Sequence, residues 1–185
     1  MSTFYDFSTF SEGTVKPTVI RIDVVSSPAT MSVNVDGVSI VKKYSTNTEV
    51  ERGIHITVLD EATGKQVDYR SFDTCINPAA SDALVNFVNS VPVDRIVVVA
   101  VRDEASIKLQ QSAKEALTKL GSGIVATLSV RQNWAMITQK KSSGGELFAE
   151  ATGYPLLNPT WPQFWAYPGI LLTTKVPLQT RTSTY

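Results

Sequence analysis

The stretch Arg95-Ile-Val-Val-Val-Ala-Val101 is apolar at every position after its first residue. A strand with one solvent-exposed face alternates apolar and polar residues, whereas a strand covered on both faces is apolar throughout. We therefore predict a central strand here, buried on both sides. The residues expected to share a single core around it are Ile56, Leu84, Phe87, Ile96, Val98, Ala100 and Leu117.

Segments on both sides of this strand alternate with the period of two residues that is typical of strands. Residues 19–25 predict a strand, and residues 31–41 and 54–72 predict two hairpins that turn at Asp36-Gly37 and at 60–65. Later segments predict further strands at 124–130, 134–138, 146–151 and 170–176.

Two other segments have apolar residues at helical spacing. Asn77-Pro78 suits the start of a helix that Pro92 ends. Ser112 and Glu115 have the spacing of a capping box, and Gly121 suits the end of a second helix. The predicted fold class is therefore α+β: a two-layer sandwich of antiparallel sheets with two flanking helices.

The composition excludes several classes of function. The chain has 185 residues with 17 basic and 17 acidic side chains, so it lacks the basic excess that nucleic acid or an anionic membrane requires. Because the chain has a single cysteine, Cys75, and a single histidine, His55, it cannot form a metal site that needs several cysteines or several histidines. Its glycines form no phosphate-binding motif. We expect no cofactor, no metal, no nucleic acid and no membrane partner.

This length suggests one domain with extended ends. We predict an N-terminal arm at 1–17, a domain at 18–178 and a polar C-terminal tail at 179–185. The N-terminus lacks the basic region and apolar run of a signal peptide, and no stretch is apolar enough to span a membrane.

Within the predicted domain, residues 153–169 combine five aromatic residues with four prolines. Exposed aromatic side chains invite aggregation, so these residues either cap the core or dock on a partner. The predicted docking residues are Trp161, Phe164, Trp165 and Tyr167. Together with the polar arm and tail, they favour a subunit of a larger assembly, with neighbouring protein subunits as partners.

No catalytic set can be assembled from the sequence. His55 faces away from the side on which Ile54 and Ile56 pack, and no motif supplies a nucleophile or an orienting acid. Cys75 is interpreted as a buried, inert thiol. The pair Asp103-Glu104 follows the central strand, where carboxylates can bind sugar hydroxyls or a metal, or serve helix electrostatics. We therefore predict that the protein is not an enzyme.

Several separate motifs resemble, in order and spacing, one protein family. They run from Arg52-Gly-Ile-His-Ile-Thr-Val-Leu59 to Leu171-Leu-Thr-Thr-Lys-Val-Pro-Leu178, and between these lie Thr63-Gly64, Phe72-Asp-Thr74, 95–106, 113–117, 120–122 and Trp134-Ala135. Over about residues 19–178 the pattern is similar to the interleukin-like EMT inducer domain, also called the GG-type domain. The resemblance implies a compact sandwich of two antiparallel sheets flanked by helices.

The family includes secreted cytokine-like proteins, the stem domain of protein O-mannose N-acetylglucosaminyltransferase and modules of hyaluronan-related proteins, and similar modules occur in phage long-tail-fibre hinge proteins. The stem domain binds N-acetylglucosamine-type sugar without catalysis. The positions here that match its sugar-contacting residues are Arg52, Asp103 and Arg131. A carboxylate accepts from paired hydroxyls, while guanidinium groups donate to hydroxyl and acetamide oxygens. Alternatively, Arg52 and Asp103 form an internal salt bridge that fixes the loops.

Two functions stay open at this point. The first is a non-catalytic module that binds N-acetylglucosamine-type glycans weakly, displayed on a virion, phage tail or similar particle surface. The second is a purely structural component of such an assembly that works through protein contacts, with the sugar site unused. A single cysteine allows no internal disulfide, unlike the secreted cytokine-like members.

Overall fold

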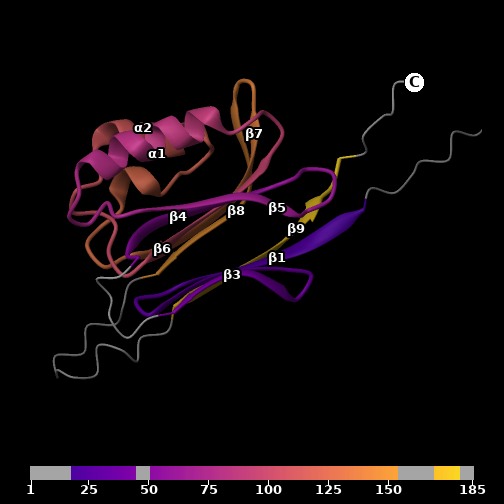
Figure 1. Cartoon of the computed structure of the whole chain (residues 1–185), viewed down its shortest axis with the longest axis horizontal. Coiled ribbons are helices and arrows are strands. Elements are labelled where there is room, and N and C mark those ends of the chain that lie inside the picture. The colour runs from indigo at the N-terminus through magenta and orange to yellow at the C-terminus, as the bar shows by residue number, and fades with distance from the viewer. Residues whose placement is uncertain (1–17, 45–50, 154–168, 180–185) are drawn as a thin grey trace, which may run out of the picture.

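The computed structural model describes residues 18–44, 51–153 and 169–179 (Figure 1). The predicted arm at 1–17 and most of the aromatic segment lie outside the described residues. The same holds for the predicted docking residues Trp161, Phe164, Trp165 and Tyr167.

Within the described ranges, nine strands form two antiparallel sheets. The four-stranded sheet has the order β3-β2-β1-β9, from β1 (Val19–Ser26), β2 (Thr30–Val35), β3 (Val38–Tyr44) and β9 (Ile170–Pro177). The five-stranded sheet has the order β5-β4-β6-β7-β8, from β4 (Gly53–Leu59), β5 (Gln66–Phe72), β6 (Ile96–Arg102), β7 (Asn133–Lys141) and β8 (Gly144–Gly153).

Two α-helices lie together on the face of the five-stranded sheet that is turned away from the four-stranded sheet (Figure 1). These are α1 (Ala79–Ser90) and α2 (Gln111–Lys119), and a single 3-10 turn, η1 (Val125–Thr127), follows α2. Each helix buries one apolar side against the sheet, which is the usual reason for an amphipathic helix to dock there.

The α+β class predicted from the sequence is wrong. In the described part of the chain, 49% of residues are in strands and only 17% in helices, so the protein is a mostly-β sandwich that carries two helices. The strands extend further than their apolar patterns indicate, because ladder hydrogen bonds continue through polar ends. Strands β7 and β8 cover 133–141 and 144–153, whereas the patterns predict strands only at 134–138 and 146–151.

The single predicted core is also wrong, because β6 separates two cores. Its residues Val97, Val99 and Val101 face the helices, in one cluster with Ile56, Leu84, Phe87 and Leu117. Its residues Ile96, Val98 and Ala100 face the four-stranded sheet in a second cluster. This follows from the period of a strand, in which successive side chains point to opposite faces.

Two local predictions are wrong: the strand at 124–130 and the capping box of Ser112 and Glu115. The segment 124–130 is not a strand: the Ser122 hydroxyl accepts the N–H groups of Ile124 and Val125, at 3.2 and 2.9 Å, and starts η1. The capping box is absent, because α2 begins at Gln111 without a side-chain cap.

We predict that Phe87→Ala lowers the free energy of unfolding by about 3–5 kcal/mol, because it removes a buried ring from the helix-side core. The ring of Phe87 lies 5.8 Å from that of Phe72, measured between centroids. Urea unfolding measures the change. Val67→Ala, at a position that is 51% exposed, serves as the control and should change stability by less than about 0.5 kcal/mol. Equal effects of the two variants would contradict this description of the core.

Candidate functional site

The five-stranded sheet opens between β6 and β7 at one end. The ladder between β4 and β6 continues to the pair Gly53–Arg102, and that between β7 and β8 continues to Asn133–Gly153. The ladder between β6 and β7, however, stops at Ala100–Ala135. We call this opening the split. It leaves the residues after β6 and those before β7 on opposite sides of a gap in the sheet.

An ion pair spans the split. Asp103, which follows β6, accepts a hydrogen bond from the guanidinium of Arg131, which precedes β7. Asp103 is only 2% exposed, whereas the Arg131 side chain is 41% exposed. The main-chain N–H of Arg131 also donates to Glu104 Oε2 at 2.5 Å. The site thus combines a buried acceptor with a donor that solvent can reach.

Arg52 reaches the same end of the sheet from β4. Because Gly53 pairs with Arg102, the preceding residue, Arg52, and the following residue, Asp103, come side by side. The Nε of Arg52 donates to both carboxylate oxygens of Asp73, at 3.3 Å each. Gly53 has φ +106°, and any side chain there would overlap the Phe72 carbonyl oxygen. The glycine of the Arg-Gly-Ile motif therefore lets Asp73 approach Arg52.

Both residues of the ion pair have a strained backbone. Asp103 has φ +60° and Arg131 has φ +61°, in the left-handed region that non-glycine residues seldom adopt. Such conformations cost on the order of 1–3 kcal/mol and cluster at functional sites, where the surroundings hold them in place. Here the N–H of Asp103 donates to the Ser27 carbonyl at 3.3 Å, and the N–H of Arg131 is held by Glu104.

The charges around Asp103 act in opposite directions. Burial raises the pKa of the Asp103 carboxyl, Arg131 lowers it, Glu104 raises it, and Arg102 and Arg52 lower it, with a net upward shift. The carboxylate is therefore poorly solvated and would gain from hydroxyl donors.

The three residues predicted to bind sugar, Arg52, Asp103 and Arg131, thus lie at one end of the sandwich. The structure adds two carboxylates that are not among these three residues: Asp73, and Glu104 of the pair Asp103-Glu104 that the sequence already indicates. Both stand inside quoted motifs, but their contacts depend on loops that meet only in the fold. The internal pairing of Arg52 that the structure shows is with Asp73, while Asp103 pairs with Arg131.

His55 and Cys75 have structural surroundings. His55 is fully buried, with Nδ1 2.7 Å from the Tyr69 hydroxyl and Nε2 2.7 Å from the Glu51 carbonyl. Burial is the main cause that lowers the pKa of His55 to about 4, so the ring is neutral at pH 7. Burial likewise raises the pKa of the Cys75 thiol, which disfavours the nucleophilic thiolate.

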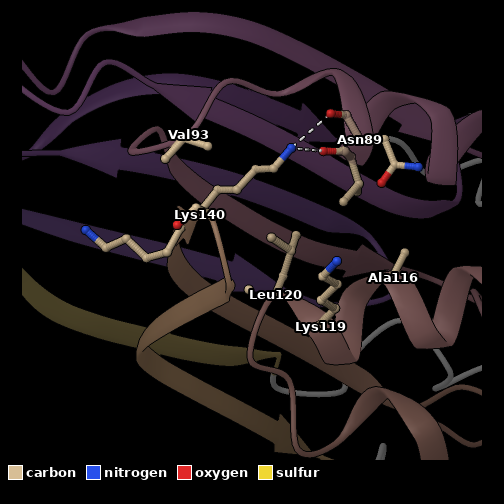
Figure 2. A pocket seen from close by; sticks show the side chains of 10 residues that line it. Asn89, Val93, Ala116, Lys119, Leu120 and Lys140 are labelled. Atoms are coloured by element: carbon tan, nitrogen blue, oxygen red, sulfur yellow. Dashed lines mark hydrogen bonds between the residues drawn. The ribbon is translucent and has the colours of Figure 1, made fainter.

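A small pocket of about 190 Å³ lies at the opposite end of the five-stranded sheet, between the two helices and the β7–β8 hairpin. Figure 2 shows Lys140 extending across it to the end of α1. The Lys140 ammonium donates to the carbonyls of Val88, Asn89 and Val91 at 2.8, 3.0 and 2.5 Å. It satisfies carbonyls that the helix leaves without partners, so the pocket belongs to the joint between helix and sheet.

In the described part of the chain, no three His, Cys, Asp or Glu side chains are grouped so as to hold a metal ion. None of its helices has the length and apolar character needed to cross a membrane.

Fold and site together define a mostly-β sandwich module with a charged site where the larger sheet opens. Residues 52–142 match the family model described as "Interleukin-like EMT inducer". This segment contains β4 to β7, both helices and all three residues predicted to bind sugar. Residues 52–142, about half of the chain, are therefore similar to the interleukin-like EMT inducer family.

Three curated relatives illustrate the family. The chain is 42% identical over 89 residues to the "Cell migration-inducing and hyaluronan-binding protein" of Mus musculus, a match covering 48% of this chain and 6% of that protein. It is 32% identical over 95 residues to the "Cell surface hyaluronidase CEMIP2" of Homo sapiens, covering 51% of this chain and 7% of that protein. It is 28% identical over 85 residues to "Protein FAM3C" of Rattus norvegicus, covering 46% of this chain and 37% of that protein.

The chain thus spans a small part of the first of these relatives and little more than a third of FAM3C. The matched family segment is shorter than the span of about 19–178 expected from the motifs, because it leaves out β1 to β3, β8 and β9. The more specific likenesses to the glycosyltransferase stem domain and to phage tail-fibre modules stay predictions.

The buried His55 predicts a loss of stability in acid. Its pKa is about 4 in the folded protein against 6.5 when unfolded, so between these values the unfolded chain binds more protons. Stability is therefore lost as the pH falls from 6.5 toward 4, by about 2 kcal/mol at pH 4.5. Urea unfolding at pH 7 and pH 4.5 measures this, with His55→Gln as the comparison that lacks the titrating ring. An identical pH dependence in both proteins would show that His55 does not titrate in this way.

Proposed function

We propose that this protein is a non-catalytic carbohydrate-binding module and that its site at the split binds N-acetylglucosamine-type glycans. The observation that carries the proposal is the meeting of Arg52, Asp103 and Arg131 at one end of the sheet. Asp103 and Arg131 are additionally held in strained backbone conformations. Strained conformations of this kind cluster at functional sites, which supports a role beyond that of a structural salt bridge.

The chemistry of these side chains suits a sugar. An ionised carboxylate offers about four acceptor positions and a guanidinium five donors, which are the groups that bind sugar hydroxyls and an acetamide. The exposed Arg131 gives access to the site from solvent. Because such a polar site competes with water, we expect millimolar affinity for a single sugar, about 4 kcal/mol.

The names of two relatives support a glycan as the ligand class. One is named for hyaluronan binding and the other as a hyaluronidase, and hyaluronan is a polysaccharide. Both names describe proteins of which this chain spans only a small part, so they suggest the kind of ligand rather than identify it.

The carboxylates at the split favour binding over catalysis. Glycoside hydrolysis commonly uses two carboxyl groups, one of them a proton donor. Glu104 Oε1 accepts the N–H and hydroxyl of Ser106, at 2.5 and 2.8 Å, and its Oε2 accepts the N–H of Arg131. Glu104 is thereby committed to holding loops.

The alternative function, a structural component of a virion or other assembly, depends on the arm and the aromatic segment. These lie outside the described residues, so docking through Trp161, Phe164, Trp165 and Tyr167 stays a prediction, as does display on a particle surface.

Asp103→Asn should weaken sugar binding at least about tenfold, because a neutral amide replaces the charged acceptor. The fold should persist within about 1 kcal/mol at pH 7, because the same change removes a buried charge whose pKa is raised. Amide shifts in NMR titrations with N-acetylglucosamine measure binding, and urea unfolding measures stability.

Asp82→Asn, at an exposed position of α1, is the matched control and should bind as the unmodified protein does. The proposal is wrong if the unmodified protein shows no shifts near the split at tens of millimolar sugar. It is equally wrong if Asp103→Asn binds normally.

A further inference from the structure

Ser26 occupies the point where β6 and β7 separate. It is the last residue of β1, in the four-stranded sheet, and it is fully buried. Its hydroxyl donates to the Val101 carbonyl at 2.6 Å and accepts the Trp134 N–H at 3.1 Å. Because Ala100 pairs with Ala135, the antiparallel register would place Val101 opposite Trp134 as the next pair. A side chain from the other sheet thus stands in for a ladder hydrogen bond.

The turn after Ser26 adds contacts on the same side of the split. The Ser27 carbonyl accepts the Asp103 N–H at 3.3 Å, and the Ala29 carbonyl accepts the Arg102 Nε at 3.3 Å. Arg102 and Asp103, where β6 leads into the site, are therefore bonded to the β1–β2 turn of the four-stranded sheet rather than to β7.

The split carries a further cost at Asn133. This residue begins β7 and is fully buried, and neither its side-chain oxygen nor its side-chain nitrogen has a hydrogen-bond partner. Buried polar groups without partners are rare and call for a physical explanation. The register would place Asn133 opposite Arg102, where the ladder no longer runs. The open end of the sheet thus leaves the polar side chain of Asn133 buried without hydrogen bonds, which costs stability. Proteins tolerate such costs chiefly at functional sites.

We propose that Ser26 is a positioning residue for the sugar site. Its hydroxyl, inserted from the four-stranded sheet, holds β6 and β7 apart at Val101 and Trp134. It thereby sets the distance between the main chains at Asp103 and Arg131, from which the two side chains reach a sugar. This inference rests on the proposed function, and it adds that the four-stranded sheet, which the family match leaves out, determines the geometry of the site.

Removing the Ser26 hydroxyl lets the Val101 carbonyl and the Trp134 N–H bond directly, which draws the two strands together by one more pair. The main chains at Asp103 and Arg131, two and three residues beyond this point, then come closer together, which moves the positions from which the two side chains reach a sugar. Binding should therefore fall while the fold persists, because the two backbone groups find each other as partners.

The experiment compares Ser26→Ala, Ser26→Thr and the control Ser32→Ala in the full chain. Ser32 is a buried serine that pairs with Val25 on the outer face of the four-stranded sheet, away from β6 and β7. N-acetylglucosamine is titrated into each protein by NMR. In the sugar-free proteins, the coupling across the hydrogen bond from the Trp134 N–H to the Val101 carbonyl reports whether the strands pair.

We expect Ser26→Ala to weaken binding about tenfold, to show the new coupling and to shift the amides of Asp103 and Arg131. Ser26→Thr keeps the hydroxyl and should restore affinity, while Ser32→Ala should bind normally. If Ser26→Ala does not fold, Ser26→Cys replaces it, because a thiol of similar size bonds only weakly and should give the same loss.

The outcomes separate the two proposals. If the unmodified protein binds sugar and a folded Ser26→Ala or Ser26→Cys binds it equally well, the positioning role is wrong and the glycan proposal stands. A loss of affinity without any change at Trp134, Asp103 or Arg131 in the sugar-free protein also overturns the positioning role. If the unmodified protein does not bind, both proposals fail.

Discussion

The packing of β6 on both faces is the constraint on which the rest of the structure depends. Its odd-numbered valines hold the helices, and its even-numbered residues hold the four-stranded sheet, so one strand joins all three layers. A strand buried in this way cannot shift by one residue without exchanging its two sets of contacts. The register of β6 therefore fixes where it ends, and its end places Asp103 at the mouth of the split.

Much of the fold could be predicted, because hydrophobic period is a local property. The strand at 96–102, both early hairpins and both helices follow from the spacing of apolar residues. The fold class and the single core could not, because they depend on how far ladders extend and on which face of β6 each element covers. The segment 124–130 shows the limit: its apolar pattern suits a strand, but the Ser122 hydroxyl bonds to the backbone and starts a 3-10 turn instead.

The site was predictable to a lesser degree. The resemblance to the family points to Arg52, Asp103 and Arg131, and the structure brings them to one end of the sheet. Nothing local in the sequence indicates that Asp73 meets Arg52, that Glu104 holds the Arg131 backbone, or that Ser26 reaches between two strands. Those contacts join positions between 21 and 108 residues apart, so they exist only once the layers assemble.

The Lys140 ammonium, fixed on three carbonyls at the end of α1, gives the protein a built-in chemical reporter. An amine-modifying reagent attacks the neutral, accessible form of lysine, and in the folded protein all three protons of this ammonium are engaged. Labelling of Lys140 therefore requires its ammonium to leave these carbonyls. The rate of that labelling, set against the rate for exposed Lys119 nearby, measures how often this contact between β7 and the end of α1 opens while the sandwich itself stays folded.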